Sequence, residues 1–136
     1  MASGRAVRGV SRGVVRDAHG CPIRGSQDAH ASLVRAIVDL LGLMRPRIEC
    51  SAVNQRPVET RKGWRCPGAC AGFPDVVGVL PPDGRCLLIE AKTGESQLRV
   101  EQRALRGRWV AAGALWITAR SVSDVVEALD WKQRCG

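Results

Sequence analysis

The stretch GFPDVVGVLPPDGRCLLIEAK, residues 72–92, decides how this sequence folds. It contains two apolar runs, VVGVL and CLLI, which are separated by PPDG. Proline presets one turn dihedral and glycine tolerates another, so PPDG predicts a tight turn and the two runs predict an antiparallel hairpin. Because both runs are almost wholly apolar, we expect this hairpin to lie in the middle of a sheet with helices on both faces.

Charged residues stand at the open end of the predicted hairpin. Pairing that starts with Leu80 opposite Arg85 continues to Asp75 opposite Glu90. Side chains alternate along a strand, so Lys92 points to the same face as Glu90, whereas Ala91 points away. The sequence therefore predicts two carboxylates and one ammonium group together at one end of a central hairpin.

This cluster of charges is typical of phosphodiester hydrolysis. Two adjacent carboxylates repel each other unless a cation lies between them, and Mg²⁺ often takes one or two carboxylates together with water and phosphate. We therefore expect Asp75 and Glu90 to bind Mg²⁺, with the carbonyl of Ala91 as a further ligand. Lys92 would then stabilise developing charge or help to deprotonate the attacking water. The alternative is a surface cluster, with Asp75 capping a strand and the other two charges solvated.

The remaining patterns predict three helices and two strands around the hairpin. Apolar residues at helical spacing predict a first helix from Ser26 to Met44, and IECSAVN predicts a short strand. A loop over 55–72, a helix over 95–113, a strand over 114–119 and a closing helix over 121–134 follow. Ser121 and Asp124 have the spacing of a capping box. The fold class is α/β, with a mixed central sheet flanked by helices in the order α-β-β-β-α-β-α.

Gln102 is an unexpected residue on the apolar face of the predicted 95–113 helix. Leu98, Leu105 and Trp109 share this face with it. A glutamine in this position either hydrogen-bonds to backbone inside the core or reaches the water or phosphate of the predicted site.

At these residues the chain resembles the PD-(D/E)XK nuclease superfamily, and specifically its VRR-NUC branch, the virus-type replication-repair nucleases. The matching elements are GFPD, the 14-residue interval, IEAK and the helix with its glutamine, within residues 27–130. The resemblance implies a restriction-endonuclease-like core, dependence on Mg²⁺ or Mn²⁺, and cleavage of branched, flapped or junction DNA by a homodimer in phage or DNA repair. Carried over by position, Asp75 and Glu90 would bind the metal, Lys92 would serve the water, and Gln102 would be an accessory residue on the helix.

One position departs from the family pattern. Many members carry a glutamate on the first helix that faces the metal, whereas this helix offers Gln27, Asp28 or His30. His30 lies on the apolar face, three residues before Leu33, so it could point inward. The roles of Asp28 and His30, and with them the number of metal ions, stay open at this point.

Length and charge suggest one domain with a polyanionic partner. The chain has 136 residues and a net charge of +8. Residues 1–26 predict a flexible basic tail, and 27–136 predict the nuclease domain. This tail carries its arginines at Arg5, Arg8, Arg12, Arg16 and Arg24. With no apolar leader and no stretch long enough to span a membrane, we expect a soluble, cytoplasmic protein. The resemblance implies that its polyanionic partner is DNA.

The predicted 55–72 loop carries two further motifs. Its basic segment, Arg61, Lys62, Trp64 and Arg65, has the composition of a nucleic-acid contact or of a solvated loop. Its CPGAC motif, Cys66 to Cys70, supplies half a zinc site, but no second pair is evident, so we expect free thiols. Two alternatives to a nuclease therefore remain: a non-catalytic nucleic-acid-binding module on the same fold, and a small zinc or scaffold protein.

Overall fold

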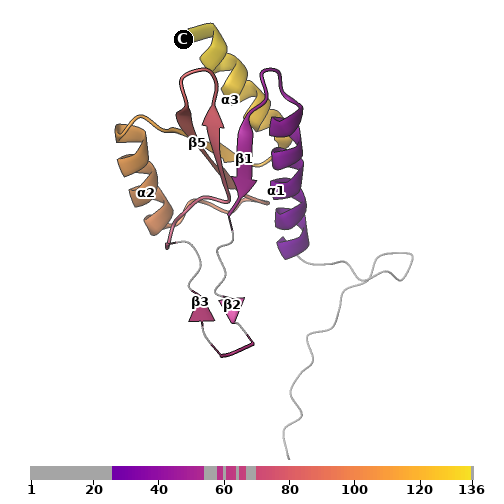
Figure 1. Ribbon diagram of the computed structural model, residues 1–136, viewed down its shortest axis with the longest axis vertical. Coiled ribbons are helices and arrows are strands. Elements are labelled where there is room, and N and C mark those ends of the chain that lie inside the picture. Colours follow the sequence, from indigo (N-terminus) through magenta and orange to yellow (C-terminus); the bar gives the residue numbers. More distant parts are fainter. Residues whose placement is uncertain (1–25, 54–57, 60, 64, 67–69, 136) are drawn as a thin grey trace, which may run out of the picture.

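The computed structural model describes residues 26–53, 58–59, 61–63, 65–66 and 70–135 (Figure 1). The predicted basic tail lies outside the described residues, apart from Ser26. The helices are α1 (Ser26–Leu43), α2 (Val100–Ala111) and α3 (Val122–Cys135). The strands are β1 (Glu49–Ala52), β2 (Val58–Glu59), β3 (Arg65–Cys66), β4 (Val76–Leu80), β5 (Arg85–Ala91) and β6 (Leu115–Ala119).

Four of the strands form one mixed sheet in the order β1-β4-β5-β6. The β1–β4 and β4–β5 pairs are antiparallel, and β5 runs parallel to β6. Together with the three helices, this sheet confirms the predicted α/β class. The predicted α-β-β-β-α-β-α order holds for the strands of this sheet, whereas β2 and β3 form a separate two-stranded sheet between β1 and β4 in the chain. The described part of the chain contains no helix that is long and apolar enough to cross a bilayer.

The central hairpin has the predicted register. Leu80 pairs with Arg85, and the pairing continues without a slip to Val76 opposite Ile89. Asp75 comes directly before the first residue of β4, and Glu90 comes directly after Ile89 in β5. The two acids therefore meet at the end of the hairpin that lies opposite its turn.

Helices cover the sheet on both faces, with α2 on one side and α1 and α3 on the other (Figure 1). Alternate residues of β5 enter the two cores, so that Leu87 and Ile89 face α1 and α3 whereas Leu88 faces α2. All three of these side chains are fully buried. This burial explains why the β5 sequence is almost continuously apolar up to Glu90.

The structure corrects three of the predicted details. On its side of the sheet, α2 covers β5 and β6 and leaves the turn end of β4 open, so that Val79 of β4 is 51% exposed. The prediction that both faces of the hairpin are covered therefore holds for β5 only. Residues 95–99 are not helical, because the guanidinium of Arg120 binds the carbonyls of Gly94 and Ser96 at 2.6 and 2.7 Å. The predicted 55–72 loop contains the β2–β3 hairpin, in which Gly63 adopts a φ of 75°.

The predicted capping box at the start of α3 is confirmed. The backbone N–H of Asp124 donates to Ser121 Oγ at 3.3 Å, and the backbone N–H of Ser121 donates to Asp124 Oδ2 at 3.1 Å. Asp124 Oδ2 also accepts the backbone N–H of Arg120 at 2.8 Å. The cap therefore fixes the backbone of Arg120, and the guanidinium of Arg120 in turn holds the segment before α2.

Candidate active site

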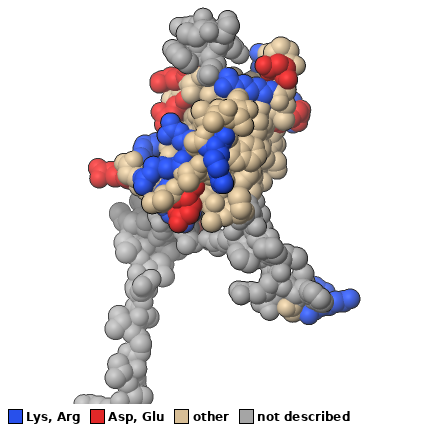
Figure 2. Space-filling view, turned by 90° about the vertical axis from the view of Figure 1, so that its left-hand side faces the viewer, with Lys and Arg blue, Asp and Glu red and all other residues tan. Residues whose placement is uncertain are grey.

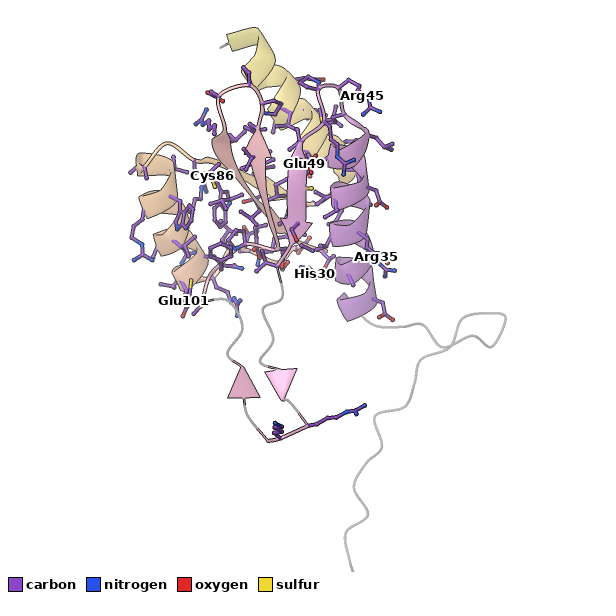
Figure 3. The ribbon with its side chains drawn as sticks, viewed as in Figure 1. His30, Arg35, Arg45, Glu49, Cys86 and Glu101 are labelled. Atoms are coloured by element: carbon purple, nitrogen blue, oxygen red, sulfur yellow. The ribbon has the colours of Figure 1, made fainter. Side chains whose placement is uncertain are left out.

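Four elements bring their side chains together at the end of the sheet away from the β4–β5 turn. Asp75 enters from the start of β4, and Glu90 and Lys92 come from the end of β5. Gln102 lies in the first turn of α2, and His30 lies in the second turn of α1. Figure 3 shows His30 at the lower end of the sheet, between the starts of α1 and α2. The structure thus brings together the four side chains that the sequence singles out, and adds a histidine.

Asp75 is held by contacts from three segments. Its Oδ2 accepts the backbone N–H of Ala91 at 2.9 Å and lies 3.1 Å from His30 Nε2. Its backbone carbonyl accepts the N–H of Val53, just beyond β1, at 2.8 Å. The carboxylate is almost buried, with the residue 9% exposed. These bonds fix the Asp75 side chain across from Glu90.

Glu90 is a buried carboxylate with one oxygen bound and one not. Its Oε1 accepts from Gln102 Nε2 at 2.5 Å and lies 3.1 Å from Lys92 Nζ. Its Oε2 is buried and has no hydrogen-bond partner among the described residues. Burial raises the pKa of Glu90, and the nearby charge of Asp75 raises it further, against the opposing effects of Lys92 and Gln102. The site therefore contains an acceptor that its own side chains leave unsatisfied.

Gln102 joins α2 to the charged pair. The residue is 1% exposed, and its Oε1 accepts from Lys92 Nζ at 2.9 Å and from the backbone N–H of Arg99 at 2.8 Å. Its Nε2 donates to Glu90. Gln102 thus binds a backbone group and both charged side chains, whereas its contact with a water or phosphate of the site stays a prediction. One amide holds the start of the helix and the position of the ammonium group.

The strand pattern explains why Glu90 and Lys92 lie on the same face. Leu88 and Glu90, two residues apart in β5, both point toward α2. The hydrogen bonding between β5 and β6 continues past the end of β5, where the N–H of Lys92 donates to the carbonyl of Ala119 at 2.9 Å. The Lys92 side chain is only 12% exposed. An ammonium group that is this deeply buried needs acceptors, and Glu90 and Gln102 supply them.

The donors of this site fit a hard divalent cation. The described residues include no group of three or more His, Cys, Asp and Glu side chains arranged to hold a metal. Mg²⁺, however, commonly takes only one or two carboxylates and completes its shell with water and substrate phosphate. Asp75 and Glu90 supply two carboxylates, and the buried Oε2 of Glu90 is an atom that a cation would satisfy. The Ala91 N–H points toward Asp75, so its carbonyl lies on the same edge of β5.

His30 is one of three residues on the first helix whose role the sequence pattern leaves open. Its place on the apolar face of the first helix, three residues before Leu33, was the available signal. The structure places it half-buried against Asp75, whereas Asp28 is exposed. The side chain of Gln27 is not described. Sequence alone could not choose between these positions, because the choice depends on how α1 packs beside the end of β4.

The predicted loop residues are only partly described. Arg61 and Lys62 are exposed in the turn between β2 and β3, and this hairpin lies beyond the same end of the sheet as the site (Figure 1). Trp64 lies outside the described residues, and Arg65 is described by its backbone alone. Cys50, Cys70 and Cys86 are free thiols; Cys70 is exposed and the other two are half-buried. The side chain of Cys66 is not described. A nucleic-acid role for this loop stays a prediction.

The fold and the site together define an α/β structure whose central hairpin ends in two carboxylates and a largely buried lysine. Comparison of the sequence with protein-family models and with curated proteins gives no match. Among solved structures, the chain is similar to one described as "VRR_NUC domain", with 17% identity and a TM-score of 0.48. The similarity covers 79% of this chain and 97% of that one. At this level of likeness, function has to be argued from the residues of the site.

Proposed function

We propose that this protein is a metal-dependent nuclease that hydrolyses phosphodiester bonds in DNA. The observation that supports the proposal best is Glu90, whose buried carboxylate faces Asp75 and leaves one oxygen without a hydrogen-bond partner among the described residues. A purely structural carboxylate in a core would be expected to have both oxygens satisfied. Glu90 instead shares one oxygen with Lys92 and Gln102 and keeps the other for a ligand.

Asp75, Glu90 and the carbonyl of Ala91 would hold the cation, which we propose to be Mg²⁺ or Mn²⁺. A bound divalent cation lowers the pKa of water and neutralises the charge of the scissile phosphate. Asp75 can take this role because His30 and the Ala91 N–H fix its Oδ2. His30 is a positioning residue in this scheme: with a proton on Nε2, it donates to Asp75 and orients the carboxylate.

Lys92 is the residue that we place beside the reacting phosphate. Its ammonium group has three donors, and Glu90 Oε1 and Gln102 Oε1 take up two of them. The third donor can bind the attacking water or a phosphate oxygen. Because this ammonium group is held in place before the substrate arrives, it can stabilise the charge that develops in the transition state without reorganising. Gln102 contributes by holding both Lys92 and Glu90.

The substrate that we propose is branched, flapped or junction DNA, cut by a homodimer. One domain of this size offers little surface to grip a branched duplex, and two copies would present two sites. Arg61, Lys62, Trp64 and Arg65 would contact the nucleic acid, with Arg61 and Lys62 exposed at the end of the sheet where the site lies. The alternative is a non-catalytic nucleic-acid-binding module on the same fold.

The test is cleavage of labelled DNAs: single strand, duplex, flap, splayed arm and four-way junction, each with Mg²⁺, Mn²⁺ or EDTA. We expect cutting that requires the metal and that Asp75→Ala or Lys92→Ala lowers by about 100-fold or more. Asp83→Ala is the matched control, since Asp83 is an exposed carboxylate in the turn at the far end of the same hairpin. It should cut like the wild type.

Two results would count against the nuclease. Binding of DNA without cutting, under every metal condition, would favour the non-catalytic module. Cutting that Lys92→Ala leaves unchanged would show that the activity comes from another site or from a contaminant. Sedimentation of the purified protein with and without a junction would test the homodimer separately.

A further inference from the structure

Three arginines form a row along one side of α2. Arg99, at the N-cap, is followed by Arg103 and Arg106 at intervals of four and three residues, which places them one above another on a helix. All three are exposed. Figure 2 looks onto this side of the molecule and shows Lys and Arg side chains gathered over α2. We call Arg99, Arg103 and Arg106 the α2 arginine row.

No ion pair within the part of the chain that the structure describes neutralises this row. Glu101 is the one acidic residue of α2, and at 100° per residue it lies on the opposite side of the helix, near Arg108. None of the ion pairs within the described residues involves a member of the row. Arg103 donates one N–H to the carbonyl of Leu98 at 2.9 Å, which steadies its side chain and leaves four donors for a ligand.

The row begins at the proposed active site. The backbone N–H of Arg99 donates to Gln102 Oε1, the same atom that accepts from Lys92 Nζ. Arg103 and Arg106 then follow one and two turns farther along the helix. A strand bound at Lys92 could therefore continue directly onto the row.

The length of the row fits a nucleic-acid backbone. Seven residues of helix span about 10 Å at 1.5 Å per residue. One strand of duplex DNA carries a phosphate about every 3.4 Å along the helix axis, so this length corresponds to about three phosphates. Guanidinium groups bind phosphate through paired N–H donors and stay charged at neutral pH.

We propose that the α2 arginine row binds the sugar-phosphate backbone of the DNA strand that flanks the bond to be cut. The placement of that strand relative to the scissile bond rests on the proposed function, whereas the binding itself does not. The row reads no base sequence, because its contacts are with phosphates. We therefore expect the row to affect the affinity for DNA and the salt dependence of that affinity.

The experiment measures the binding of labelled duplex DNA in EDTA over a range of salt concentrations. Each phosphate contact contributes about 0.9 to the slope of log affinity against log salt, so the triple variant Arg99→Gln, Arg103→Gln, Arg106→Gln should lower the slope by about 2 to 3. Affinity at moderate salt should fall at least about tenfold. Arg108→Gln removes one positive charge from the other side of α2 and should keep the slope of the wild type.

A second variant separates charge from folding. Arg99→Lys, Arg103→Lys, Arg106→Lys keeps the positive charges and should restore most of the slope. An unchanged slope in the glutamine variant would overturn the proposal, as would an equal loss per charge in Arg108→Gln. Loss of slope in a protein that never cuts DNA would support the row while the nuclease proposal fails, so the two proposals are tested separately.

Discussion

Glu90 combines a role in the site with a cost to the fold. The carboxylate is buried, Asp75 lies nearby, and together these raise its pKa above the ordinary value of 4.5. In the unfolded chain the pKa returns to its ordinary value, so the folded protein binds a proton more tightly. The free energy of unfolding should therefore fall as the pH rises from the ordinary pKa through the raised one.

We expect Glu90→Gln to stabilise the folded protein at neutral pH, because it removes a buried charge that folding disfavours and keeps an oxygen that can accept from Gln102 and Lys92. The measurement is the melting temperature of both proteins in EDTA at pH 7.5 and near pH 4. The melting temperature of the variant should exceed that of the wild type at pH 7.5, and the difference should shrink in acid. A variant that melts lower at neutral pH would show that the Lys92 pair outweighs the cost of burial.

At the scale of single elements, the start of α2 is the part of the site that sequence patterns placed least well. The apolar spacing of Leu98, Leu105 and Trp109 predicted the helix and the face on which Gln102 lies. The pattern also extended the helix back to residue 95, whereas α2 begins at Val100. The cause is Arg120, which is distant in sequence and binds the carbonyls of Gly94 and Ser96. Local periodicity contains no information about such a contact.

Gly72 lets the start of α2 approach the turn that precedes β4. It has a φ of 84°, and a Cβ there would lie 2.6 Å from the backbone C and O of Glu101. We expect Gly72→Ala to cost about 1–3 kcal/mol of stability and to lower the cleavage rate at saturating substrate, because it pushes Gln102 away from Glu90 and Lys92. Urea denaturation and the rate measurement test this expectation.

Gly84→Ala is the matched control for this prediction. Gly84 has a similar φ of 79°, but its nearest neighbour would be Val79 Cγ1 at 3.9 Å, an ordinary contact. It should lose stability through backbone strain and cut DNA at the wild-type rate. Equal losses of rate in the two variants would mean that the approach of α2 to Gly72 does not position the site.

At the scale of the whole molecule, local sequence patterns predict the central hairpin, whereas part of the site depends on how distant elements pack. The turn in PPDG and the apolar runs beside it were enough to predict the hairpin, its register and the meeting of Asp75 with Glu90. The contact between His30 and Asp75 was not predictable, because it depends on the packing of α1 against the sheet. The short β2–β3 hairpin was missed, since pairs of two residues leave no periodic pattern to detect.

Both helical layers pack on β5, so we expect the described part of the chain to unfold as one unit. Leu87 faces α1 and α3, Leu88 faces α2, and both are fully buried. Leu87→Ala and Leu88→Ala should each cost about 2–5 kcal/mol, whereas Val79→Ala at the exposed end of β4 should cost less than about 1 kcal/mol. Denaturation followed by circular dichroism and by tryptophan fluorescence should give coincident transitions in each variant. Separate transitions in either leucine variant would show that the layers unfold independently.

The turn of the β4–β5 hairpin lies at the opposite end of the sheet from Asp75 and Glu90. Five residue pairs separate the two ends, a length of about 17 Å at 3.4 Å per residue. Residues 81–84 in this turn are exposed. An affinity tag or a fluorescent label inserted there would sit far from the proposed active site, so this turn is the natural attachment point for surface immobilisation and single-molecule observation of the protein.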